Sequence, residues 1–173
     1  MVLPLVLSLA ALAAPEAGAA DPLAAARDGM LQCYAPDQAH RTCKALSGYA
    51  FGPEGVVNQA EVLVSPAGPM TMRTASPVVV REGAVCGPVR AEDIDASQVI
   101  FAGRPLGGDQ AQRAKAQLKG GLGGLLGAEV CTTYLAAPQG YTTRVTVNGT
   151  PAPEMSGSPM IWVRADEGWT VAP

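Results

Sequence analysis

The sequence contains a single histidine, His40, and histidine is the side chain whose ordinary pKa lies closest to neutral pH. His40 is therefore the first candidate for a general base, and Asp37 is a carboxylate near enough in the sequence to orient it. Serine nucleophiles of many hydrolases stand in a Gly-x-Ser-x-Gly turn, which this sequence lacks. We predict no catalytic residue, and we keep as the alternative function a small periplasmic hydrolase that uses His40 with a carboxylate.

Two other segments have a composition that could bind a ligand. Glu92, Asp93 and Asp95 could offer carboxylate oxygens to Ca²⁺, but they lack the alternating ligands and central glycine of an EF-hand loop. Acidic residues are also typical of the first turn of a helix, where they face the positive end of its dipole. In the glycine-rich segment 119–127 the lysine precedes the glycines, whereas in a phosphate-binding loop it follows them. We predict no metal and no cofactor.

Four aromatic residues in the C-terminal part of the chain form a candidate binding surface: Tyr134, Tyr141, Trp162 and Trp169. Trp162 lies in a segment with the composition of a strand, in which successive side chains point to opposite faces. At least one aromatic side chain can therefore face outward. Exposed Trp and Tyr residues often carry much of the binding energy of an interface.

The N-terminal residues have the pattern of a secretion signal. Residues 1–14 are uncharged and largely apolar, but they are fewer than the roughly 20 residues that span a bilayer as a helix. Small residues at 17–19 then match the positions that a signal peptidase requires. We predict a signal peptide over residues 1–19, a mature chain that begins at Ala20, and a periplasmic or secreted location without a stable membrane span after cleavage.

The four cysteines, Cys33, Cys43, Cys86 and Cys131, fit this location. An even number of cysteines without a C-x-x-C motif favours two disulfides over a metal or redox site in an oxidising compartment. Three pairings can be drawn, and we favour Cys33 with Cys43 and Cys86 with Cys131. In the chain-entropy description the short loop contributes about 3 kcal/mol and the longer one about 4 kcal/mol.

Composition limits the remaining function classes. Of the 173 residues, 48% are hydrophobic and 16% are charged, which favours a folded core over a disordered chain. The formal net charge of −3 argues against a nucleic-acid partner.

The hydrophobic pattern predicts helices and short strands. Leucines at helical spacing predict an amphipathic helix from Asp109 to about Leu126. A second helical region is predicted over 22–46, broken near Pro36, and a short helix over 89–96. Segments rich in β-branched and aromatic residues predict strands at 48–51, 56–64, 69–74, 78–81, 99–102, 130–136, 141–147, 160–164 and 168–171.

An apparent internal repeat links these elements. At an offset of 88 residues, Asp21 falls on Asp109 and Cys43 falls on Cys131. We therefore predict an α+β fold of two similar helix-plus-antiparallel-sheet units stapled by disulfides, the first over 20–86 and the second, with a short linking segment, over 87–173. A chance alignment within a chain rich in Ala, Gly and Pro is the alternative explanation.

Several short segments resemble small exported proteins of Gram-negative bacteria. They are CY at 33–34, RTC at 41–43, VCGPVR at 85–90, VCTTY at 130–134 and IWVR at 161–164. The resemblance spans most of the mature chain and implies a periplasmic location and paired cysteines, but no known activity. Together these observations predict an exported, non-catalytic binding or envelope-associated protein, with another envelope protein as a candidate partner.

Overall fold

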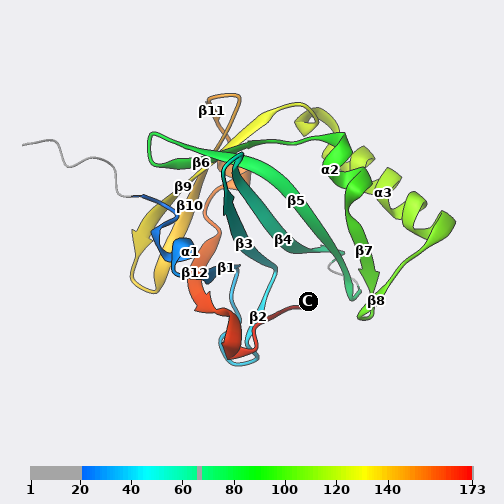
Figure 1. The fold of residues 1–173 in the computed structure, drawn as a ribbon, viewed down its shortest axis with the longest axis horizontal. Helices are drawn as coiled ribbons and strands as arrows, with labels where there is room; N and C mark the ends of the chain where they lie inside the picture. Colours follow the sequence, from blue (N-terminus) through cyan, green and yellow to red (C-terminus); the bar gives the residue numbers. More distant parts are fainter. Residues whose placement is uncertain (1–20, 66–67, 173) are drawn as a thin grey trace, which may run out of the picture.

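The structure is a computed structural model that describes residues 21–65 and 68–172, and a closed ring of eight antiparallel strands dominates it (Figure 1). Each strand pairs with the next barrel strand along the chain, and the last pairs with the first. The strands are β1 (Met30–Tyr34), β3 (Ala45–Gly52), β4 (Gly55–Ser65), β5 (Met70–Arg81), β6 (Ala84–Pro88), β9 (Glu129–Ala137), β10 (Gly140–Val147) and β12 (Pro159–Arg164). The architecture is an up-and-down barrel.

The predicted fold of two α+β units stapled by disulfides is therefore wrong. One barrel uses strands from both proposed units, and β6 runs across the proposed boundary between residues 86 and 87. The positions that the repeat would match also differ in structure. Cys43 lies on the two-residue strand β2 (Thr42–Cys43), outside the ring, whereas Cys131 lies within β9 in the barrel wall. Local helix and strand patterns could not reveal that the two halves close one ring.

The predicted helix over 22–46 is also wrong. Helical structure there is limited to α1 (Ala24–Arg27), and β1, β2 and the start of β3 follow it. Alternation explains the difference: Gln32 in β1 is paired with Ser47 in β3, and both are buried in the barrel, whereas Cys33 belongs to a cluster outside it. The alanine-rich start of the segment suggested a longer helix than forms.

The predicted strands 69–74 and 78–81 are parts of one strand, β5. Pro77 suggested a break, because proline cannot donate a hydrogen bond to a strand ladder. In the structure β5 pairs with β7 (Gln98–Phe101) through residues 70–73 and with β6 through residues 79–81. Pro77 lies between these two ladders, opposite Val57 of β4, and the strand therefore continues through it.

The chain between β6 and β9 makes an excursion outside the barrel. It contains α2 (Ala91–Ala96), β7, β8 (Arg104–Pro105), α3 (Gly108–Leu122) and the 3₁₀ turn η1 (Gly123–Leu125). Strand β7 pairs with the first residues of β5, 70–73, and so extends the sheet beyond the barrel. Helices α2 and α3 lie beside β7 (Figure 1). The helix predicted from Asp109 is confirmed as α3, followed by η1.

The N-terminal segment closes one end of the barrel. Leu23, directly before α1, is fully buried and clusters with Ala26 and Val85. The surrounding side chains are those of Tyr49, Val56, Val78, Tyr134 and Trp162. The guanidinium carbon of Arg27 lies 4.3 Å from the ring centre of Phe51, which fastens α1 to β3.

A second cluster covers the outer face of β1 and β12. It contains Cys33, Cys43 and Val163, with Trp169 packed against them. Strand β2 pairs in parallel with β13 (Thr170–Val171), so the C-terminal segment holds this cover in place. The other short elements are β11 (Thr150–Pro151), which pairs with β10, and the 3₁₀ turns η2 (Pro153–Met155) and η3 (Ala165–Glu167).

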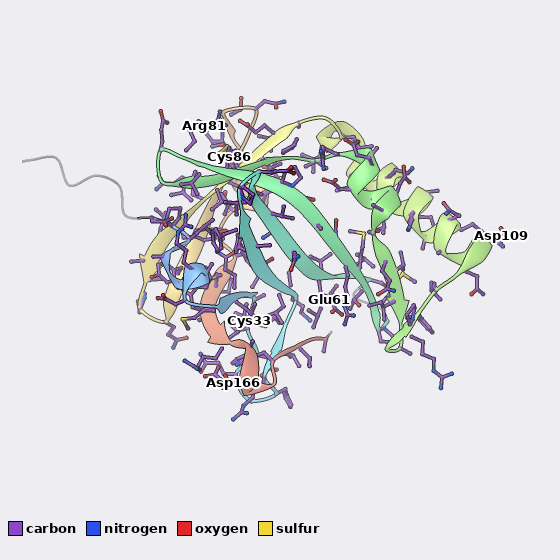
Figure 2. The ribbon with its side chains drawn as sticks, in the orientation of Figure 1. Cys33, Glu61, Arg81, Cys86, Asp109 and Asp166 are labelled. Carbon is purple, nitrogen blue, oxygen red and sulfur yellow. A yellow bond between two sulfur atoms is a disulfide. The ribbon has the colours of Figure 1, made fainter. Side chains whose placement is uncertain are left out.

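The two disulfides have the pairing favoured from the sequence, Cys33–Cys43 and Cys86–Cys131. They lie in different parts of the barrel (Figure 2). The first ties β1 to the outer strand β2. The second joins directly opposed residues of β6 and β9, 45 positions apart in the sequence, and so closes the base of the excursion.

We expect the Cys86–Cys131 disulfide to stabilise the protein more than Cys33–Cys43 does. By loop entropy the difference between the 45-residue and 10-residue separations is about 1 kcal/mol. Urea unfolding of the two double Cys→Ser variants measures it. A markedly larger loss for the pair at 33 and 43 would contradict the prediction.

Candidate functional site: the barrel lumen

A cavity of about 630 Å³ fills much of the barrel interior. Its lining side chains come from β1, β3, β4, β5, β6, β9 and β10 and from adjoining loops. Exposed residues Lys44, Pro88 and Ser158 line the end opposite Leu23, so the cavity reaches solvent there. A volume of this size is in the range of small-molecule sites, and an eight-stranded barrel is wide enough for one small ligand.

The two halves of the barrel wall differ in polarity. The half formed by β1, β3, β4 and β5, called here the polar wall, presents hydrogen-bonding side chains to the lumen among apolar ones. The polar side chains are Tyr34, Ser47, Tyr49, Asn58 and Ser76, and the apolar ones are Ala45, Ala60, Val62, Leu63 and Val78. The half formed by β6, β9, β10 and adjoining loops, called here the aliphatic wall, presents mainly Val85, Val89, Val130, Val145 and Met155, together with the hydroxyls of Thr132, Thr143 and Ser158. The lumen therefore combines an apolar surface with a few convergent polar groups, which is the usual composition of a ligand site.

A buried polar cluster lies inside the barrel, next to the polar wall. Gln32 is fully buried, and its Oε1 accepts hydrogen bonds from the hydroxyls of Tyr49 at 2.7 Å and Tyr34 at 3.0 Å. The hydroxyl of Tyr134 lies 3.3 Å from the same oxygen and 2.8 Å from the Tyr34 hydroxyl. Within 21–65 and 68–172, Nε2 of Gln32 has no hydrogen-bond partner. A buried polar atom without a partner is uncommon in a folded protein.

Tyr34 and Tyr49 of this cluster are neutral phenols. Burial raises the pKa of Tyr34 well above its usual value, and the neighbouring Tyr134 and Tyr49 raise it further. Burial also raises the pKa of Tyr49. The polar wall therefore offers hydrogen bonds without carrying a charge.

The charge of the lumen lies at its mouth. Lys44 is the one charged residue among the described residues that line the lumen, and it is exposed. Asp93 of α2 is a charged group outside the lumen lining whose pKa is affected by Ser76 of the polar wall. Burial acts to raise the pKa of Asp93, but hydrogen bonds from Arg90 and Ser76 and the charge of Arg90 lower it below its usual value. Asp93 is therefore a structural anion.

The four aromatic residues predicted as a binding surface do not form one. Tyr134 lies within the barrel, and Trp162 packs against Leu23 at the closed end. Tyr141 is half buried on β10, whereas Trp169 packs outside against the Cys33–Cys43 disulfide. Of the four, Tyr134 alone contributes to the polar cluster beside the lumen.

His40 lies outside the lumen, in the loop between β1 and β2. Its side chain is 76% exposed, and its Nδ1 lies 2.8 Å from Oδ2 of Asp37. The expected carboxylate partner is therefore present, but the pair is on the surface and does not line the cavity. Among the described residues, His40 therefore lies apart from the lumen, which counts against a hydrolase that uses it there.

The acidic residues lie in and beside α2 and form ion pairs. Arg90 interacts with Asp93 and Glu92, and Lys119 of α3 lies 2.7 Å from a carboxylate oxygen of Asp95. Nζ of Lys115 donates a hydrogen bond to the carbonyl oxygen of Asp95 at 2.7 Å. These contacts hold α2 against α3. The glycine-rich segment forms the end of α3 and the turn η1.

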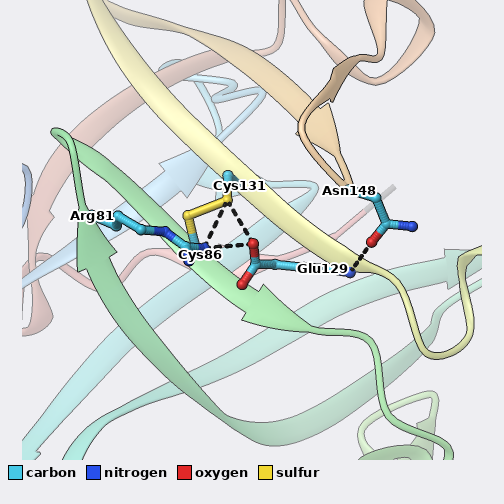
Figure 3. Close-up of a disulfide and its surroundings, with 5 residues drawn as sticks. All are labelled: Arg81, Cys86, Glu129, Cys131 and Asn148. Atoms are coloured by element: carbon cyan, nitrogen blue, oxygen red, sulfur yellow. Dashed lines mark hydrogen bonds and ion pairs between the residues drawn. A yellow bond between two sulfur atoms is a disulfide. The ribbon is translucent and has the colours of Figure 1, made fainter.

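The surroundings of the Cys86–Cys131 disulfide also contain potential metal ligands (Figure 3). Glu129 brings a carboxylate oxygen to within 4.8 Å of both sulfur atoms, and Arg81 donates a hydrogen bond to this carboxylate. The Glu129 backbone N–H donates to Oδ1 of Asn148 at 2.9 Å. Because the sulfurs are joined to each other, this group offers no thiolate to a metal.

Comparisons with protein-family models, curated proteins and solved structures find no match to this chain. In the described part of the chain, no helix has both the length and the apolar character needed to cross a membrane.

Gln32, Tyr34 and Tyr49 were not predicted as site residues from the sequence. Two of them fell in the predicted helix, and the third was assigned to a strand without a function. The usable signal was alternation, because Gln32 and Tyr34 share one face of β1 and Ser47 and Tyr49 share one face of β3. Polar side chains repeated on a buried face of a strand indicate a polar interior.

We expect His40 to titrate above its usual pKa of 6.5, because hydrogen bonding to the Asp37 carboxylate and its charge both favour the protonated ring. Any stability from this pair is therefore present below pH 6.5 and is lost as the pH rises through the native pKa. NMR titration of the single histidine measures the midpoint, and Asp37→Asn should move it down towards 6.5. A native midpoint at or below this value would contradict the assignment.

Proposed function

We propose that this chain is an exported, non-catalytic binding protein that takes one small molecule into the barrel lumen. The observation that carries the proposal is the cavity of about 630 Å³, open at the end marked by Lys44 and lined by one polar and one aliphatic wall. Small-molecule sites typically have such a shape and composition.

The composition of the lumen favours binding over catalysis. The described residues that line it include no His, Cys, Asp or Glu side chain. Tyr34 and Tyr49, which line it, have raised pKa values and stay protonated at neutral pH. General acid–base catalysis needs a group with a pKa near the working pH, and this cavity offers none among those residues. The alternative function, a hydrolase that uses His40, loses support because His40 is exposed and does not line the cavity.

The disulfides indicate the kind of cellular compartment in which the protein works. Two disulfides among four cysteines indicate an oxidising, non-cytoplasmic compartment. The proposal of a periplasmic or secreted protein adds to this the signal-peptide pattern of residues 1–19, which lie outside the described residues.

We expect an uncharged, polarity-sensitive dye to enter the lumen. Prodan, an uncharged naphthyl ketone, should bind the oxidised protein with one site per chain and a shift of its emission to shorter wavelength. Ala45→Trp adds a large side chain to a lumen-lining position of β3 and should weaken binding by about tenfold or more. Ala50→Trp is the matched control, because Ala50 is an exposed residue of the same strand and faces outward.

Two results would count against lumen binding. One is an absence of Prodan binding to the folded wild-type protein. The other is equal weakening by Ala45→Trp and Ala50→Trp. Circular dichroism of both variants checks that the barrel is intact, and Ala45→Leu gives a milder block if the tryptophan variant fails to fold.

The exported protein should begin near Ala20. Intact mass of the protein recovered from the periplasmic or secreted fraction measures its N-terminus directly. Recovery there of a chain that retains residues 1–19 would contradict the signal-peptide prediction.

A further inference from the structure

We infer that the polar wall of the lumen recognises an uncharged ligand through a hydrogen-bond acceptor, such as the carbonyl oxygen of a ketone, lactone or amide, while the ligand's apolar body packs against the aliphatic wall. The inference rests on the proposed function and names the chemical class of its ligand. Its structural basis is the cluster of Gln32, Tyr34, Tyr49 and Tyr134 together with the difference between the two walls.

The first argument is the balance of donors and acceptors in the cluster. Three phenol hydroxyls converge on Oε1 of Gln32, which has two lone pairs, and the hydroxyls of Tyr34 and Tyr134 also bond to each other. The Gln32 amide nitrogen adds two further hydrogens, and among the described residues none accepts them. The three hydroxyls can satisfy one another and Oε1, because a phenol oxygen also accepts a hydrogen bond. The amide nitrogen of Gln32 is the donor that lacks an acceptor among the described residues.

The second argument is access. Tyr34 and Tyr49 both line the lumen and also bond to Gln32. A hydroxyl can rotate about its C–O bond, so either tyrosine can redirect its hydrogen towards an acceptor that enters the cavity. Asn58 and Ser47, on the same wall, provide additional polar contacts for such a group.

The third argument concerns charge. Among the described residues that line the lumen, the single charged side chain is Lys44, at the exposed mouth. Buried charges in proteins are normally paired, and an ionised carboxylate held at the polar wall would have neutral partners alone. A neutral carbonyl gains hydrogen bonds there without that desolvation cost.

The fourth argument is the shape of the complementary wall. Valines of β6, β9 and β10 and Met155 face the polar wall across the ring. Their side chains provide apolar surface for a ring or a short hydrocarbon body. A ligand with its acceptor at one edge and its apolar face on the other side satisfies both walls at once.

Competition against Prodan on the oxidised protein tests this inference. Acetylnaphthalene carries a neutral carbonyl, ethylnaphthalene has nearly the same shape without an acceptor, and naphthoate carries a negative charge. We expect acetylnaphthalene to compete about tenfold better than ethylnaphthalene, as one or two good hydrogen bonds would give, and naphthoate to compete worse than acetylnaphthalene.

The variants identify the groups that produce this preference. Tyr34→Phe combined with Tyr49→Phe should remove the advantage of acetylnaphthalene and leave the affinity of ethylnaphthalene within about twofold. Tyr141→Phe is the matched control, because Tyr141 is half buried on β10 but does not line the cavity. Tyr49→Phe alone serves if the double variant does not fold.

The outcomes separate the inference from the proposed function. If Prodan binds in the lumen but the ketone has no advantage, if naphthoate competes best, or if the tyrosine variants leave the preference unchanged, the inference is wrong and the proposed function stands. If Prodan fails to bind, or Ala45→Trp has no specific effect, both are wrong. A preference for the ketone that disappears with the two lumen tyrosine hydroxyls supports the inference.

Discussion

Pairing between β1 and β12 is the constraint on which the rest of the structure depends. It joins the beginning of the folded chain to its end, with Gln32 opposite Trp162 and Cys33 opposite Ile161. Without this ladder the eight strands would form an open meander with two unpaired edges, which are prone to pair with other chains. Closure removes both edges and creates an interior. It also brings Gln32, near the N-terminal end of the barrel, beside Tyr134, about 100 residues later.

The size of the side chains inside the ring then determines that this interior is hollow. Only 5% of the chain is aromatic, and much of the lumen lining consists of Ala, Ser, Thr and Val. Large side chains gather at the closed end instead, where Trp162 and Tyr134 surround Leu23. The N-terminal segment thus fills one end of the barrel, and the small side chains leave the remainder open. The large side chains therefore fill the closed end, and the small side chains along the rest of the ring leave the cavity.

Local patterns in the sequence predicted many elements but not their assembly. The strands of the second half and the helix that begins near Asp109 have strong local signals, and the structure contains them. The ring depends on pairing between distant segments, which no local pattern specifies. The disulfide pairing was predicted correctly, although the predicted repeat does not describe the fold. Cys86 and Cys131 pair because β6 and β9 are neighbours in the ring and the excursion between them leaves and returns at the same place.

The candidate site was less predictable than the individual strands and the helix α3, because its residues have ordinary local surroundings. Gln32 stands in a short strand next to a cysteine, and its sequence neighbours give no sign that three tyrosines will converge on its side chain. Only the closed ring makes such a glutamine informative, because the interior prevents solvent from satisfying its amide. In an open sheet, a neutral amide on a buried strand face would be a weak indication of a binding site. Inside a barrel with a cavity beside it, the same side chain holds the lumen-lining hydroxyls of Tyr34 and Tyr49 in place, and this role follows from topology rather than from a motif.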